Sequence, residues 1–124
     1  LVDTRSENFD LVKEGIHTYK EIRHDLMTAL PYWPLGISHY KDSWVCVGEK
    51  AKTKDYLAVW RRNSEKSTIQ LPIRHLAGLN VSVRCIYPKA QNGSYLWNRE
   101  SGIFTVTLPV EFSARLFELS AENY

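Results

Sequence analysis

The sequence predicts a mainly β protein, an antiparallel β-sandwich of about seven strands preceded by one amphipathic α-helix. Apolar residues recur every three or four positions over 6–29, and after Pro31 the repeat changes to two in short apolar runs. The 124 residues correspond to about one domain. We divide the chain into an N-terminal helix (1–30), a connector rich in proline and aromatic residues (31–42) and a C-terminal β-sandwich (43–124).

The predicted helix at 6–29 carries an apolar stripe along one side. Its members are Phe9, Val12, Ile16, Tyr19, Ile22 and Leu26. Gly15 lies on the same side, where the missing side chain allows another element to approach closely. Because an exposed apolar patch of this size favours a partner, we expect the stripe to be covered, either by the sandwich or by a second copy in a dimer.

The residues after the helix predict an extended connector and then strands. Pro31 and Pro34 disfavour helical conformation at the residues before them. The expected strands lie at 43–48, 56–61, 68–73, 81–87, 95–97, 102–108 and 115–119. In 81–87, Val81, Val83, Cys85 and Tyr87 share one face, as in a half-buried strand. In 56–60 both faces are apolar, which is typical of a central strand that the helix or a neighbouring domain covers.

Composition excludes several classes of partner. The net charge of +2 comes from 16 basic and 14 acidic residues, too balanced to indicate nucleic acid. No apolar run approaches the roughly 18 residues of a membrane span. We therefore expect neither a nucleic-acid nor a membrane partner.

The cysteines indicate a reducing, cytoplasmic location, since Cys46 and Cys85 lie in apolar runs and no CxxC motif occurs. Glycosylation sequons at Asn80 and Asn92 leave secretion as the alternative. The first residue is leucine and the single methionine is Met27, in mid-helix. We interpret the chain as a domain of a longer parent protein.

The sequence contains no complete catalytic or metal centre, and we expect no catalytic residue, metal ligand or cofactor in this chain. His17, Glu21 and His24 could offer three metal ligands from one helical face, but the HExxH pattern of zinc helices is absent, and a solvated face is the simpler interpretation. A glycosidase needs two carboxylates beside the scissile bond. No spacing forces two of the candidates to converge; they are Asp42, Glu49, Asp55, Glu100, Glu111 and Glu118.

The aromatic residues are the remaining candidates for binding. Trp97 and Tyr95 are candidate carbohydrate-binding residues, because aromatic rings can stack on sugar faces. The alternative is that these rings, like Trp33, Trp44 and Trp60, fill the core and its interface with a neighbour.

Several segments together carry a family resemblance. They are Tyr-Lys-Glu-Ile-Arg at 19–23, Leu-Pro-Tyr-Trp-Pro-Leu-Gly at 30–36, Trp-Val-Cys-Val-Gly at 44–48, Tyr-Leu-Ala-Val-Trp-Arg-Arg at 56–62, Tyr-Pro at 87–88 and Ala-Arg-Leu-Phe at 114–117. Over nearly the whole chain they resemble the glycoside hydrolase family 36 α-galactosidases. These enzymes have an N-terminal β-supersandwich, a central (β/α)8 barrel and a C-terminal antiparallel β domain. The resemblance implies that 6–29 is the last barrel helix and that 43–120 is the C-terminal domain.

The resemblance also implies a function for the parent enzyme. It would hydrolyse terminal α-galactosides such as melibiose and raffinose, with retention and without a metal. The related raffinose and stachyose synthases leave a transferase open. The family's catalytic aspartates lie on barrel strands, and the nucleophile belongs to a Lys-Trp-Asp motif. This chain has no Lys-x-Asp sequence, so no catalytic residue is carried over. We expect an accessory sandwich that packs on its own barrel, with a homo-oligomer contact through the helix face; the alternative is a carbohydrate-binding module. Galactoside would bind only to the parent.

Overall fold

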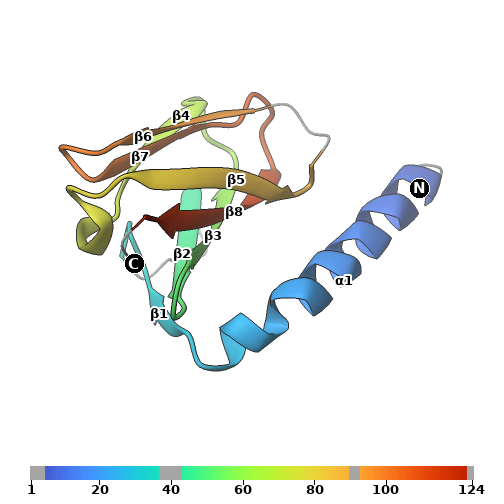
Figure 1. Cartoon of the computed structure of the whole chain (residues 1–124). Helices are drawn as coiled ribbons and strands as arrows, with labels where there is room; N and C mark the ends of the chain where they lie inside the picture. Colours follow the sequence, from blue (N-terminus) through green and yellow to red (C-terminus); the bar gives the residue numbers. More distant parts are fainter. Residues whose placement is uncertain (1–4, 37–42, 90–92, 123–124) are drawn as a thin grey trace.

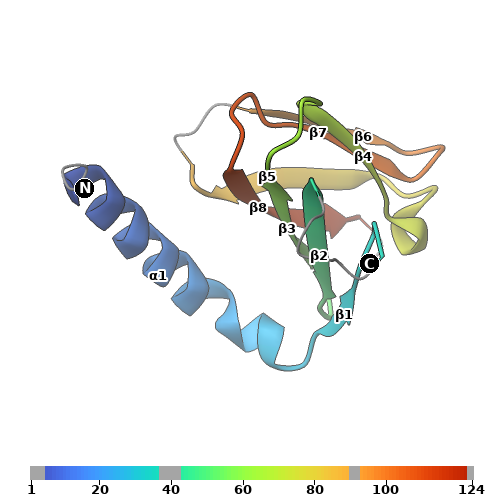
Figure 2. The ribbon, with the colours of Figure 1, turned by 180° about the vertical axis from the view of Figure 1, so that it is seen from behind.

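One helix and two antiparallel sheets form three layers in the computed structural model, which describes residues 5–36, 43–89 and 93–122. The helix α1 (Arg5–Met27) lies on one side of a five-stranded sheet, and a three-stranded sheet lies on the other (Figures 1 and 2). The predicted mainly β sandwich preceded by one helix is confirmed.

The larger sheet has the order β1-β2-β3-β8-β5, and the smaller has the order β4-β7-β6. The strands of the larger sheet are β1 (Leu30–Tyr32), β2 (Trp44–Lys50), β3 (Asp55–Arg61), β8 (Ser113–Ala121) and β5 (Val81–Tyr87). Those of the smaller sheet are β4 (Thr68–Pro72), β7 (Ile103–Thr107) and β6 (Ser94–Asn98). A 3-10 helix, η1 (Arg74–Leu76), follows β4.

The described residues contain eight strands where the sequence predicts about seven. The difference is β1, in the segment that we expected to begin the connector. It pairs with β2, with Pro31 opposite Glu49. Proline is tolerated there because β1 is an edge strand, so the missing N–H need not serve a second neighbour. The rest of the predicted connector, 37–42, lies outside the described residues.

The core fills the space between the two sheets. Phe104 of β7 and Phe117 of β8 meet edge to face at its centre, with ring centroids 5.1 Å apart and an interplanar angle of 85°. Leu57 and Val59 of β3 are fully buried beside them. The predicted central strand is confirmed, because β3 lies between β2 and β8.

Strand β5 departs from simple alternation near its end. Val81, Val83 and Cys85 pack against the core as expected. The register with β8 then shifts between Cys85 and Tyr87. Such an irregularity re-aims the following side chain. Tyr87 therefore contacts α1, and the expectation that it shares the face of Val81 is wrong.

Hydrogen bonds towards both ends of α1 hold it against the sheet. Near its N-terminal half, the Tyr87 hydroxyl donates to the Leu11 carbonyl at 2.9 Å. A Cβ at Gly15 would lie 3.3 Å from the Tyr87 ring, so the glycine permits the close approach that we predicted. Near the other end, the Tyr56 hydroxyl donates to Asp25 Oδ2 at 2.6 Å.

These contacts rotate the helix away from the orientation that its periodicity predicts. Ile22 and the small Thr18 are buried against the sheet. Val12, Ile16 and Tyr19 remain 55%, 52% and 57% exposed. The sandwich therefore covers Ile22 but not the N-terminal part of the stripe, because the helix presents a neighbouring face to the sheet; cover by a second copy stays a prediction. The side chain of Phe9 lies outside the described residues.

Candidate functional site

An apolar groove with a volume of about 370 Å³ lies between α1 and the outer face of the five-stranded sheet. The helix contributes Tyr19, Ile22 and Leu26, and the sheet contributes Val47, Ala58 and Trp60. The sheet residues lie side by side because Val47 pairs with Ala58 across β2 and β3, and Trp60 follows two positions later.

The groove is only half covered. The helix buries Tyr56 at the first outward-facing position of β3, whereas Trp60, four residues along the same strand, is 41% exposed. Val12 and Ile16 continue the exposed apolar surface along α1. Contiguous exposed apolar surface of this kind marks an interaction site more often than an ordinary solvated face.

A single carboxylate lies in this apolar lining. Glu49 of β2 borders the groove, and burial raises the pKa of its carboxyl above the usual range. Among the described residues its carboxylate forms no ion pair or hydrogen bond. A molecule that fills the groove would therefore gain by bringing a cation or a hydrogen-bond donor to Glu49.

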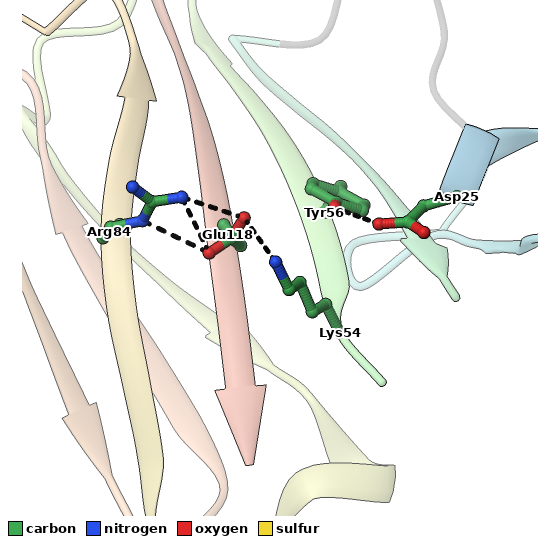
Figure 3. Close-up of polar contacts among 5 residues, drawn as sticks. All are labelled: Asp25, Lys54, Tyr56, Arg84 and Glu118. Carbon is green, nitrogen blue, oxygen red and sulfur yellow. Dashed lines mark hydrogen bonds and ion pairs between the residues drawn. The ribbon is translucent and has the colours of Figure 1, made fainter. Parts of the chain in front are cut away.

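Beyond Tyr56 the space between helix and sheet becomes polar, with a cavity of about 200 Å³. The Tyr56 hydroxyl points to Asp25 in Figure 3, and burial together with this hydrogen bond raises the pKa of the phenol. The phenol is therefore neutral at physiological pH and serves as a donor to the carboxylate.

The buried carboxylate of Glu118 lies near Tyr56, on the adjacent strand β8. Arg84 of β5 reaches both of its oxygens at 3.1–3.2 Å, and Lys54 approaches at 3.4 Å (Figure 3). The Glu118 side chain is 10% exposed, so these two cations compensate its lost hydration. Asp25 and Glu118, the acids of this cluster, each have a partner among the described residues. The cluster therefore stabilises the contacts of the helix and the strands.

The candidate carboxylates from the sequence lie in different parts of the fold. Glu49 borders the groove, Glu118 belongs to the polar cluster, and Asp55 is buried between the sheets. Glu100 and Glu111 are exposed, and Asp42 lies outside the described residues.

The candidate metal ligands of the helix, His17, Glu21 and His24, are all exposed to solvent. His17 and Glu21 form an exposed pair at 3.7 Å. Within the part of the chain that the structure describes, no group of three or more metal-binding side chains occurs.

Tyr95 and Trp97, the candidate sugar-binding residues, both lie on β6 and contact the core. The Tyr95 ring meets Phe117 edge to face with centroids 5.3 Å apart. Trp97 packs against the core cluster, and its Nε1 donates to the Leu79 carbonyl at 3.0 Å. This placement favours packing for Trp97, whereas Tyr95 is still 42% exposed beside a cavity of about 260 Å³. Sugar binding by the two stays a prediction.

Sequence reasoning missed the residues that orient the helix. Asp25 reads as one more polar residue of the helix surface, although it lies three positions after Ile22 and so borders the buried side. That position is the signal that could have identified it. Tyr87 gives no such signal, because its contact with α1 depends on the shifted register in β5.

Comparison of the chain with protein-family models, curated protein sequences and solved structures gives no match. Among the described residues, no helix combines the length and apolar character of a membrane span.

Proposed function

We propose that this chain is a structural β-sandwich whose helix-covered face packs against another domain, as the C-terminal accessory domain of an α-galactosidase packs on its barrel. The half-open groove carries the proposal, since Trp60 and Tyr19 expose apolar surface toward one continuous space. A neighbouring domain would cover this surface and supply a donor for Glu49.

The segments that resemble the family support the assignment to an α-galactosidase. The Tyr-Leu-Ala-Val-Trp-Arg segment at 56–61 lies in β3, and its outward-facing Trp60 borders the groove. The parent's activity would be retaining hydrolysis of terminal α-galactosides such as melibiose and raffinose, or the related transfer reaction. In this chain Asp25 and Glu118 serve structural contacts, which agrees with an accessory role.

A charge placed in the groove tests the proposal. Trp60→Glu in the complete gene product should lower its thermal unfolding temperature, because a carboxylate would be buried at the domain interface. The same change in the isolated chain should cost much less, since the ring is 41% exposed there. Gln70→Glu is the matched control, because it adds the same charge to an exposed position of β4 in the other sheet.

Two results would contradict this proposal. Equal destabilisation of the complete product by Trp60→Glu and Gln70→Glu would show that the groove remains solvated. Concentration-dependent dimerisation of the complete product, lost in Trp60→Glu, would instead assign the groove to a second copy. A chromogenic α-galactoside tests the activity directly: the complete product should hydrolyse it and the isolated chain should not.

A further inference from the structure

Another pocket, which shares no lining residue with the groove, lies at one end of the sandwich. Its volume is about 430 Å³, within the range of small-molecule sites. One wall is the turn after β1, with Trp33 and Pro34, and the other is the corner between β4 and η1, with Pro72, Arg74 and His75. The pocket therefore joins the segment after the helix to the smaller sheet.

A buried carboxylate fixes the histidine at the base of this pocket. Asp55 is fully buried, and its Oδ2 lies 2.5 Å from both the Tyr32 hydroxyl and His75 Nε2. Because an ionised carboxylate only accepts hydrogen bonds, we assign both neighbours as donors, which leaves Nδ1 of His75 for other contacts. The Tyr32 ring also meets the His75 ring edge to face, with centroids 4.8 Å apart. The imidazole is thus held in one orientation before any ligand arrives.

The walls of the pocket add an aromatic face and a cation. Trp33 is 42% exposed, and the Gly36 N–H donates to its carbonyl at 2.9 Å, which closes the turn. Gly36 has φ +84°, a conformation that glycine adopts without strain. The exposed Arg74 guanidinium forms no ion pair or side-chain hydrogen bond within the described residues.

The charges of the residues that line the pocket favour an anionic ligand. Asp55 is occupied by Tyr32 and His75, so the Arg74 guanidinium gives the described lining its positive charge. Guanidinium groups bind carboxylate and phosphate through paired hydrogen bonds, and an exposed indole offers an apolar face on which a ring can lie.

We propose that this pocket binds a small organic anion built on a flat or pyranose ring, with the ring on Trp33 and the anionic group on Arg74. The ligand would carry one anionic group beside an apolar ring face, and this group would be either a carboxylate or a phosphate. The site goes beyond the proposed domain packing and does not depend on it.

Three sugars that share one ring provide the probes: glucuronate, glucose 6-phosphate and glucose. Calorimetry and the indole N–H resonances of the full chain should report binding of at least one anionic sugar in the millimolar range, and none of glucose. Trp33→Phe should identify the shifted resonance. The preferred anion then distinguishes a carboxylate site from a phosphate site.

Variants locate the binding. Arg74→Gln should weaken it by at least about tenfold, because a charge-assisted hydrogen bond is lost, and this residue does not touch Asp55. The matched control is Arg23→Gln on the exposed face of α1, which should leave the affinity unchanged. Trp60→Glu should also leave it unchanged, so that failure of this proposal is separate from failure of the domain-packing proposal. The absence of binding by both anions, equal binding of glucose, or unaltered affinity in Arg74→Gln would overturn the inference.

Discussion

Gly48 and Tyr32 form the contact on which we base the most detailed prediction. They face each other across β1 and β2. A Cβ added at Gly48 would lie 2.5 and 2.7 Å from Cε2 and Cε1 of the Tyr32 ring, and nearer still to Cζ. Carbon atoms in proteins do not approach so closely, so the Gly48→Ala substitution must displace the ring from the strand.

The displacement has two costs. Forcing an extra methyl group into a packed site costs about 1–3 kcal/mol. Moving the ring also withdraws the Tyr32 hydroxyl from the buried Asp55 carboxylate, and a hydrogen bond to a charged group contributes about 1.5–3 kcal/mol. Alanine returns about 0.5–1 kcal/mol, because it loses less backbone entropy than glycine. We therefore expect Gly48→Ala to lower the free energy of unfolding by about 3 kcal/mol.

A double-mutant cycle followed by urea unfolding measures this contact. In the Tyr32→Ala background no ring opposes the new methyl group, so Gly48→Ala should be neutral or slightly stabilising. Tyr32→Phe separates the hydrogen bond from the ring and should cost about 1.5–3 kcal/mol without any clash. The reasoning is refuted if Gly48→Ala costs less than about 0.5 kcal/mol in the wild type, the scale of an ordinary surface change, or costs the same in both backgrounds.

Three further predictions concern titratable groups. Burial raises the pKa of Cys46 to about 12 and also raises the pKa of Cys85, which is less buried. Alkylation near pH 8 should therefore modify Cys85 first and Cys46 only after unfolding. Mass spectrometry that finds both thiols labelled together would contradict this. Burial also raises the pKa of Glu49, so the folded state binds the carboxyl proton more tightly than the unfolded state does. The resulting stability is present below the unfolded pKa of about 4.3 and is lost as pH rises through the folded pKa. The Glu49→Gln substitution should therefore gain stability relative to wild type as pH rises from about 4 to 7 in urea titrations, and a pH-independent difference would refute the assignment. Arg84→Ala should lower the free energy of unfolding by about 1 kcal/mol, a value between those of exposed and buried ion pairs, because Arg84 is 66% exposed while Glu118 is 10% exposed. The loss should become smaller in salt, and a salt-independent loss would indicate that Arg84 acts through packing.

Local alternation was sufficient to predict most strands. In β2, for example, Trp44 and Cys46 are buried while the intervening Val45 is less so, and such a pattern is visible in the sequence itself. The strand β1 was not predicted, because two prolines in seven residues indicate a connector and the paired residues of β2 lie 16 to 20 positions further along the chain. The shifted register near Tyr87 was equally invisible, since it depends on how β5 meets β8.

The groove could be predicted only in part. The apolar outer face of β3 was visible in Ala58 and Trp60, and it correctly indicated a cover. Which side of α1 provides that cover depends on the contacts of Tyr87 and Asp25 with distant residues. The predicted apolar stripe is broad, and its members Val12 and Ile22 point in different directions around the helix, so the stripe alone does not show which part of it meets the sheet.

The strand order of the larger sheet has a consequence for synthesis on the ribosome. β8 lies between β3 and β5, so the hydrogen bonds on the edge of β3 that faces away from β2 wait for 113–121, the last of the described strands to be made. Until then β3 has an unpaired edge, and unpaired edges recruit strands from other chains. At typical elongation rates of about 5–20 residues per second, the nascent chain carries this open edge for several seconds after β3 is complete. Its yield in a cell should therefore respond to translation speed and chaperone supply between residues 61 and 113 more than to substitutions that leave the finished fold unchanged.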